Sequence, residues 1–123
     1  MEKKRILISD DDESLLAALS TRFGREGYDV ITAFDGHNAL AQAARKHPDM
    51  IIMDVNLPGS NGFAVQERLQ KLGWLSTPVI YMTGERSDRV EILSRQFDAL
   101  AVFYKPLDTN KLLLTVRNAL AES

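Results

Sequence analysis

Short apolar runs alternate with amphipathic helical patterns along the whole of this 123-residue chain. An apolar run of four to eight residues between turn signals is typical of a strand that is buried on both faces. We expect strands of this kind at residues 5–9, 29–33, 50–54, 79–83 and 100–104. Their alternation with helices predicts five βα units, and therefore a parallel sheet covered by helices on both faces.

The segments between these runs carry apolar side chains at helical spacing, as Leu15, Leu19 and Phe23 do in the first of them. We expect helices at residues 13 to 24 or 27, 36–46, 63–72, 87–97 and 108–121. The fourth of these helices is the least apolar. It is therefore either an ordinary solvated face or a mobile, partner-facing element.

Length and composition restrict the chain to one globular domain, which we place at residues 1–123. The formal net charge of −2 gives no general attraction to nucleic acid or to an acidic membrane surface. The absence of cysteine excludes disulfides, thiolate metal sites and thiol nucleophiles. No apolar stretch approaches the roughly 20 residues of a membrane span, and no secretion signal is present, so we expect a cytoplasmic protein without membrane contact.

Polar groups stand at the ends of four of the five predicted strands. The apolar run at 50–53 ends in Asp54, and the first run leads through Ser9 into three consecutive aspartates. The fourth and fifth runs end in the hydroxyl of Thr83 and the amine of Lys105. Because ligands of open parallel sheets bind outside the carboxyl ends of the strands, we expect these groups to converge.

If Asp10, Asp11 and Asp54 converge they repel one another, since two like charges about 4 Å apart cost about 4 kcal/mol at an effective dielectric of 20. Mg²⁺ fits such a site, because it prefers oxygen ligands and commonly binds through one or two carboxylates and a phosphate. Lys105 supplies a second positive charge, able to pair with Asp54 in the empty site and with a phosphoryl oxygen afterwards. The residues therefore predict a site for a dianion beside Mg²⁺.

An aspartate in such a site can attack a phosphoryl group and form an acyl phosphate. That reaction requires a metal ion and fixed positive charge more than it requires a general base. The hydroxyl of Thr83 can donate to the new phosphoryl oxygen, and the small Gly84 beside it leaves that side of the site open. We expect the added charge to draw this segment inward, and the fourth helix and fifth strand to repack.

On these residues the chain resembles the receiver domain of two-component response regulators over essentially its whole length. The resemblance implies a flavodoxin-like doubly wound (βα)5 fold, an α/β architecture with a five-stranded parallel sheet in the order 2-1-3-4-5. It identifies Asp54 as the phosphoacceptor, Asp11 as a direct Mg²⁺ ligand and Asp10 as a ligand that more often acts through water. Asn56 matches the residue whose backbone carbonyl binds the metal.

Other positions match the same family in the same order along the chain. Thr83 matches its switch hydroxyl, and Lys105 matches its phosphate-sensing lysine. Pro58 and Gly62 match its turn after the third strand, where we expect the glycine to be useful for its tolerance of positive φ. Pro106 matches the proline after the lysine, and the resemblance implies a cis bond before it.

Three features depart from the family pattern. The aromatic residue that often stands three positions before the lysine is replaced by Val102, and Phe103 and Tyr104 follow it, so aromatic gating in its usual form is not expected. Asp98 stands where many receivers have glycine, and aspartate tolerates unusual backbone angles. Ser9 replaces a typical apolar residue, and we expect its hydroxyl to bond to the backbone.

Some of these residues also have simpler interpretations. Asp12 is expected to cap the first helix, and Asp10 and Asp11 taken alone read equally well as capping residues. His37 and His47 are expected to be solvated surface residues with no role in phosphotransfer. Only the combination with the other strand ends favours a metal site over a cap.

The expected function is that of a signalling switch, phosphorylated on Asp54 by a sensor histidine kinase or a histidine phosphotransfer protein. Its chemistry is self-catalysed phosphotransfer and autodephosphorylation, so it is not an enzyme in the usual sense. The resemblance implies that an output partner, or a second copy of the chain, binds the surface formed by the fourth helix, the fifth strand and the fifth helix. Trp74 either covers the edge of a helix or anchors a partner.

Three alternative functions stay open at this point. A receiver-like interaction module would bind its partner without phosphate, and its complex would not respond to Asp54→Asn. A Mg²⁺ phosphohydrolase would also form an aspartyl phosphate, but such sites want a second aspartate where this chain has Asn56. A flavin protein of similar topology would want Gly, Ser and Thr in the loop where this chain has three aspartates.

Overall fold

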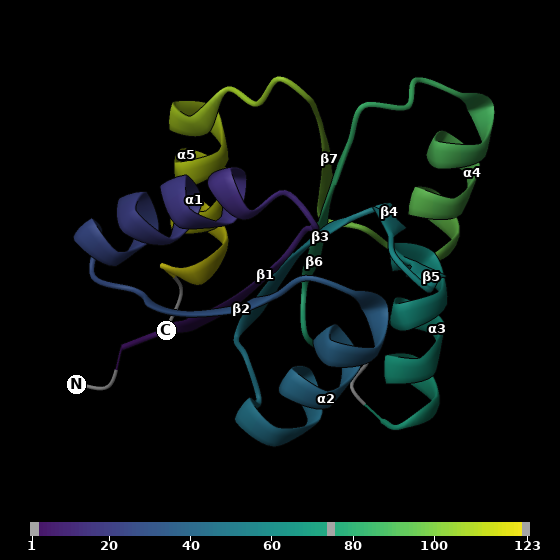
Figure 1. Ribbon diagram of the computed structural model, residues 1–123, viewed down its shortest axis with the longest axis horizontal. Helices are drawn as coiled ribbons and strands as arrows, with labels where there is room; N and C mark the ends of the chain where they lie inside the picture. The colour runs from purple at the N-terminus through teal and green to yellow at the C-terminus, as the bar shows by residue number, and fades with distance from the viewer. Residues whose placement is uncertain (1–2, 74–75, 122–123) are drawn as a thin grey trace.

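Five parallel strands form the central sheet of the computed structural model, which describes residues 3–73 and 76–121. The strands lie in the order β2-β1-β3-β6-β7 (Figure 1). All four neighbouring pairs in this sheet are parallel. Counted along the chain, these are the second, first, third, fourth and fifth strands of the sheet, so the predicted order 2-1-3-4-5 is confirmed.

The boundaries of the elements agree with the predicted ones to within one or two residues. The sheet strands are β1 (Arg5–Ser9), β2 (Asp29–Ala33), β3 (Met50–Asp54), β6 (Val79–Thr83) and β7 (Ala101–Tyr104). The helices are α1 (Glu13–Arg25), α2 (Gly36–Lys46), α3 (Gly62–Lys71), α4 (Asp88–Gln96) and α5 (Thr109–Leu120). A small antiparallel hairpin of β4 (Asn56–Leu57) and β5 (Ser60–Asn61) was not predicted, because two residues per strand are too few to show a period.

Helices cover both faces of the sheet, with α1 and α5 on one face and α2, α3 and α4 on the other (Figure 1). α1 and α5 contribute Phe23 and Val116 to a buried apolar cluster on their face. α2 and α3 contribute Ala43 and Leu69 to the cluster on the other face, and the half-buried Phe97 beyond the end of α4 packs against it. This is the doubly wound arrangement that the alternating pattern predicts.

The side chains of β1 alternate between these two clusters, as the period of a strand requires. Ile6 and Ile8 belong to the cluster under α1 and α5, and Leu7 belongs to the cluster under α2 and α3. All three side chains are at most 1% exposed. Burial on both faces explains why the strands appear in the sequence as continuous apolar runs.

Each helix begins beside a polar side chain that accepts a hydrogen bond from a backbone N–H of the first turn. The capping residues are Asp12, Asp35, Asn61, Ser87 and Asp108. The cap predicted at Asp12 is confirmed, since its carboxylate accepts from the N–H of Leu15 at 3.1 Å. Four of the five caps follow a sheet strand by a few residues, so they fix the loops that carry the polar strand ends.

Among residues 3–73 and 76–121, two that are not glycine adopt the left-handed backbone conformation. Asp98 has a φ of 53°, which confirms the unusual backbone angle predicted there. His47 has a φ of 50° and ends α2. His37 and His47 are both exposed, as the sequence predicts, while Trp74 lies outside the residues that the structure describes.

Ser9 contradicts its prediction. Its hydroxyl is completely buried and has no hydrogen-bond partner among the described residues. The reason lies in the sheet, because β1 pairs with a strand on each side and its backbone groups are used in that pairing. Strand alternation places Ser9 on the same face as Leu7, which is the apolar α2 and α3 side.

No helix within residues 3–73 and 76–121 has the length and apolar character needed to cross a membrane.

Candidate functional site

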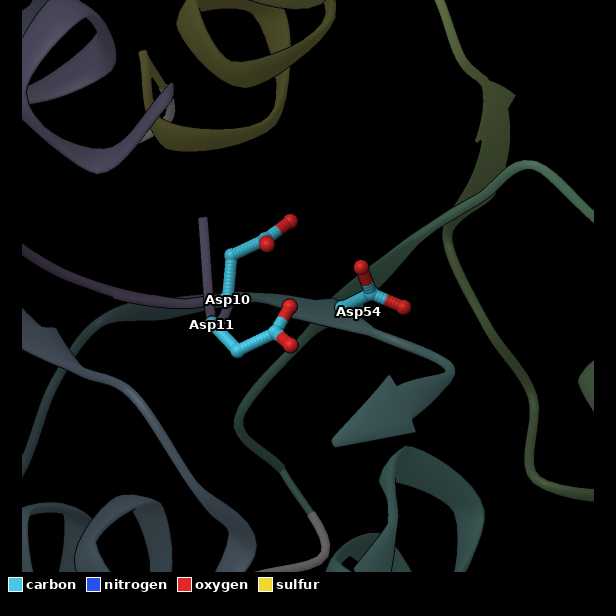
Figure 2. A group of neighbouring side chains, drawn as sticks. All are labelled: Asp10, Asp11 and Asp54. Atoms are coloured by element: carbon cyan, nitrogen blue, oxygen red, sulfur yellow. The ribbon is translucent and has the colours of Figure 1, made fainter. Parts of the chain in front are cut away.

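Three carboxylates gather at the carboxyl edge of the sheet (Figure 2). Asp10 and Asp11 follow the end of β1, and Asp54 ends the adjacent strand β3. One oxygen of each carboxylate lies within 4.8 Å of an oxygen of the other two. The predicted convergence of these aspartates, which are up to 44 positions apart in the sequence, is therefore seen in the structure.

The three carboxylates lie at different depths. Asp10 is completely buried and Asp54 is 5% exposed, whereas Asp11 is exposed to solvent. Backbone N–H groups hold the two buried ones, because the N–H of Asp12 donates to Asp10 Oδ1 at 2.8 Å and the N–H of Asn56 donates to Asp54 Oδ1 at 2.7 Å. Asp11 is thus the most solvent-accessible of the three carboxylates.

Lys105 lies between the two buried carboxylates. Its Nζ is 2.5 Å from Asp54 Oδ2 and 2.7 Å from Asp10 Oδ2. The predicted pair with Asp54 is confirmed, and the second contact with Asp10 was not anticipated. A single ammonium therefore compensates two carboxylates that would otherwise repel each other.

The ionisation of these groups follows from burial and from their partners. Burial raises the pKa of Asp54 above its ordinary value, although the hydrogen bonds from Lys105 and Asn56 act in the opposite direction. Burial acts to lower the pKa of Lys105, but its bonds to Asp10 and Asp54 outweigh this and the net shift is upward. The ammonium is held in its charged form by the carboxylates around it.

Thr83 ends β6 and is completely buried. Its Oγ1 accepts a hydrogen bond from the N–H of Glu85 at 2.9 Å, and its carbonyl accepts one from the N–H of Lys105 at 2.8 Å. The threonine is thus tied both to the loop that follows it and to the lysine of the neighbouring strand. A Cβ added to the exposed Gly84 would meet no atom within 4 Å, so the space beside this residue is open.

The loop after β3 requires glycine for a reason that differs from the predicted one. Gly62 does not have a positive φ; a Cβ there would lie 2.6 Å from the carbonyl oxygen of Asp54. The positive φ in this loop belongs to Gly59, at 75°, directly after Pro58. Gly62 therefore allows α3 to approach the strand end that carries Asp54. The Lys105–Pro106 bond is cis, as predicted.

Aromatic residues near the site lie where the sequence places them, but one contact was missed. Val102, Phe103 and Tyr104 are all half-buried in β7. The guanidinium carbon of Arg86 lies 4.1 Å from the centre of the Tyr104 ring. No pattern in the sequence links these two residues, because Arg86 lies in the loop between β6 and α4 and Tyr104 lies in β7.

The donors fit a hard divalent cation. Carboxylate oxygens are the ligands that Mg²⁺ prefers, and two of the three are buried where only one ammonium compensates them. The third, Asp11, is exposed to solvent. Asp10, Asp11 and Asp54 together therefore form a group that could hold a metal ion.

A doubly wound sheet whose carboxyl edge brings together an acidic group, a lysine and a buried threonine is the arrangement expected of a receiver domain. The family model described as the response regulator receiver domain matches residues 6–117. The chain belongs to this family.

Known proteins similar to this chain agree with that assignment. It is 36% identical over 122 residues to the alkaline phosphatase synthesis transcriptional regulatory protein PhoP of Bacillus subtilis, covering 98% of this chain and 50% of that protein. It is 36% identical over 116 residues to the transcriptional regulatory protein KdpE of Mycobacterium tuberculosis, covering 93% of this chain and 50% of that protein. The chain thus spans about half the length of these curated relatives.

Solved structures show the same fold over nearly the whole chain. A CheY-like response regulator receiver domain protein from Methanospirillum hungatei superposes with a TM-score of 0.91 at 29% identity, covering 98% of this chain and 95% of that one. The chemotaxis response regulator CheY4 of Vibrio cholerae superposes with a TM-score of 0.88 at 31% identity, covering 97% of this chain and 100% of that one. The flavodoxin-like fold predicted from the sequence is confirmed.

Proposed function

We propose that this receiver domain accepts a phosphoryl group on Asp54 in a Mg²⁺-dependent reaction. The observation that carries the proposal is the position of Lys105, which bridges Asp54 and Asp10 beside the exposed Asp11. One lysine among three carboxylates leaves an excess of negative charge that a divalent cation would offset. The resulting site has a nucleophile, a metal position and a fixed positive charge, which are the parts that phosphoryl transfer requires.

In the proposed reaction a carboxylate oxygen of Asp54 attacks phosphorus, and the bond from phosphorus to the leaving group breaks with its electron pair going to that group. Asp10, Asp11, Asp54 and the backbone carbonyl of Asn56 would hold Mg²⁺, which would neutralise charge on the phosphoryl oxygens when it is bound. The ammonium of Lys105 transfers from the carboxylate of Asp54 to a phosphoryl oxygen. No histidine or cysteine base takes part.

Thr83 would then couple the phosphoryl group to the rest of the domain. Its hydroxyl has a proton to donate while its oxygen accepts from the N–H of Glu85. A shift of Thr83 towards the phosphoryl group therefore pulls the loop before α4 with it. The surface formed by α4, β7 and α5 is where we expect this movement to change partner binding or homodimerisation.

The phosphodonor is proposed to be a sensor histidine kinase or a histidine phosphotransfer protein, in the cytoplasm. The support for this partner is the receiver family itself, together with relatives that are named as transcriptional regulators. Those relatives are about twice as long as this chain, so their output activities are not carried over to it. Hydrolysis of the acyl phosphate by the domain itself would end the signal, and no other turnover is proposed.

The decisive experiment is the intact mass of the protein after incubation with acetyl phosphate. Wild type should gain one labile phosphoryl group in the presence of Mg²⁺ and none when the metal is chelated. Asp54→Asn should gain none under either condition, while Asp98→Asn serves as a matched surface control that reacts normally. Labelling that persists in Asp54→Asn would assign the wrong phosphoacceptor.

The two functions that compete with this one are separated by further measurements. Steady turnover of a small phosphate ester would indicate a phosphohydrolase, which the presence of Asn56 two residues after the nucleophile argues against. If wild type gains no phosphoryl group from acetyl phosphate, transfer from a phosphorylated histidine kinase is the next test. Failure of both reactions would favour an interaction module that works without phosphate.

A further inference from the structure

The segment between β6 and α4, residues 84–87, is bound at both of its ends. At the first end, the N–H of Glu85 donates to Thr83 Oγ1 at 2.9 Å. At the second, the carboxylate of Glu85 accepts from Ser87 Oγ at 2.6 Å and from Arg89 Nη2 at 2.8 Å. These hydrogen bonds connect the hydroxyl of Thr83 to the segment, and the segment to the first turn of α4.

Arg86 ties the middle of this segment to the neighbouring strand. Its guanidinium carbon lies 4.1 Å from the centre of the Tyr104 ring, a cation–π contact. Tyr104 is the last residue of β7 and pairs in register with Thr83. The chain therefore leaves the sheet at Thr83, and three residues later Arg86 contacts Tyr104 of β7, the strand that pairs with β6.

Tyr104 stands on the face of β7 that looks towards α4. Val102 packs against the cluster under α2 and α3, and strand alternation places Tyr104 on the same face, two residues nearer the site. A surface hollow of about 270 Å³ lies between the ring, Arg86 and Ser87, Asp88 and Glu91 of the α4 start. The ring and the guanidinium therefore have room to separate without disturbing the core.

We propose that the contact between Arg86 and Tyr104 is a latch that positions Thr83 in the arrangement without phosphate. The inference rests on the proposed function, because it concerns how that same site responds to a phosphoryl group. Arg86 and Tyr104 are positioning residues: they act on the reacting group through the segment and Thr83. Inward movement of Thr83 draws the segment with it and breaks the cation–π contact.

The strength of the latch follows from the contact that is lost. A cation–π contact at an exposed site corresponds to about a two- to fivefold change in an equilibrium constant. Removing either partner takes away a contact made only in the arrangement without phosphate. It should therefore strengthen binding of a phosphoryl analogue by about two- to fivefold.

The sign of this change separates the latch from simple electrostatics. Arg86 is a positive charge near a site that binds an anion, so an ordinary charge effect predicts weaker anion binding when it is removed. The latch predicts stronger binding. A merely structural role predicts no change in affinity once the variant is folded.

The test uses beryllofluoride with Mg²⁺ as the probe, a stable analogue of the phosphoryl group. The fraction of bound probe is measured from its ¹⁹F NMR signal over a concentration series. Arg86→Met and Tyr104→Leu should each bind about two- to fivefold more tightly than wild type. Tyr104→Phe keeps the ring and Arg95→Met removes a charge from the far end of α4, so both should match wild type.

Two further readouts keep the test specific to the contact. The double variant Arg86→Met with Tyr104→Leu should bind no more tightly than the better single variant, because both substitutions break one contact. In a 3-fluorotyrosine sample, the signal that disappears in Tyr104→Phe should shift in Arg86→Met without any ligand. It should shift in the same direction when wild type binds beryllofluoride.

Each outcome decides the proposal. Weaker or unchanged binding in Arg86→Met and Tyr104→Leu overturns the latch and leaves the proposed function intact, provided wild type binds the probe. Additive gains in the double variant also overturn it. If wild type binds no beryllofluoride and gains no phosphoryl group on Asp54, the proposed function has failed and the latch fails with it.

Discussion

At the scale of single residues, Lys105 is the cation that binds both buried carboxylates of the site. It is 28% exposed by side chain, and it bonds to two carboxylates whose side chains are 0% and 7% exposed. Those two carboxylates are also the proposed metal ligands, Asp10 and Asp54. The lysine therefore competes with the cation that the site is proposed to bind.

Replacing this lysine should strengthen metal binding. We expect Lys105→Met to bind Mg²⁺ about five- to tenfold more tightly than wild type, because the two buried carboxylates lose their only counter-ion in the described structure. Isothermal titration calorimetry with MgCl₂ measures this, and Lys111→Met on α5 is the control for loss of charge. Equal affinities in the three proteins would show that the lysine does not compete with the metal.

Gly62 must be glycine because another part of the chain lies too close to it for a side chain to fit. A Cβ at this position would lie 2.6 Å from the carbonyl oxygen of Asp54 and 3.2 Å from Cγ of Met53. Both neighbours belong to a central strand that cannot shift easily. Gly62 does not have a positive φ, so the constraint that the structure shows at this position is space.

We expect Gly62→Ala to lower the free energy of unfolding by about 1–3 kcal/mol, the usual cost of overpacking a core. Gly24→Ala is the matched control in α1, where a Cβ meets nothing within 4 Å and the helix should gain up to about 1 kcal/mol. Urea unfolding of the two variants and wild type gives both values. A Gly62→Ala protein as stable as wild type would mean that α3 can move away from the strand.

At the scale of elements, the turn from β1 to α1 assigns a different role to each of three identical residues. Asp10 is buried and bonded to Lys105, Asp11 is exposed beside the other two carboxylates, and Asp12 caps α1. The cap also orders the site, because the N–H of Asp12 donates to Asp10 Oδ1. The sequence shows three equal acids, and only the start of the helix distinguishes them.

These roles predict different responses to substitution. Asp12→Ala should cost about 0.5–2 kcal/mol of stability through loss of the cap and should retain Mg²⁺ binding. Asp12→Asn keeps a capping oxygen and should be close to wild type. Thermal unfolding and Mg²⁺ titration check both expectations, and loss of metal binding in Asp12→Asn would place this carboxylate in the metal site instead.

For the fourth helix, the sequence left two interpretations open, and the structure adds the contacts of its first turn. Its residues were compatible with a plain solvated face or with a partner-facing element. In the structure its first turn is linked to Thr83 through Glu85, Ser87 and Arg89. α4 is therefore connected to the site, and its role as a partner-facing element stays a prediction.

At the scale of the whole molecule, burial of the Asp54 carboxylate in the site lowers the free energy of unfolding. Burial raises the pKa of Asp54 above its ordinary value of 3.8, so the folded protein retains this proton to higher pH than the unfolded chain does. The contribution of Asp54 to the free energy of unfolding is fully present below pH 3.8, and it is lost as the pH rises through the raised pKa of the folded state. At neutral pH the ionised, buried carboxylate therefore destabilises the folded state.

Asp54→Asn should remove this cost. In the absence of Mg²⁺ we expect the variant to be about 0.5–2 kcal/mol more stable than wild type at neutral pH. The difference should shrink as the pH is lowered towards 3.8, because wild-type Asp54 then becomes neutral too. Urea unfolding across this pH range measures it; a variant less stable than wild type at neutral pH would show that the bond to Lys105 outweighs burial.

Most of the architecture was predictable from the sequence because its signals are local. Burial on both faces makes each central strand a continuous apolar run, and helical spacing marks the segments between them. The strand order came from the family resemblance and not from these patterns. The hairpin of β4 and β5 was missed because it has no period, and Ser9 was misjudged because its bonding depends on strands beside it.

The sequence by itself determined where each strand ends and which polar residue stands there, because both are properties of a few consecutive residues. Tertiary structure decided how those residues meet. Lys105 reaches carboxylates 51 and 95 positions away, and Arg86 meets Tyr104 across a loop and a strand. Such contacts depend on the register of neighbouring strands and on which side chains fill the space between them, and neither is written in any local pattern.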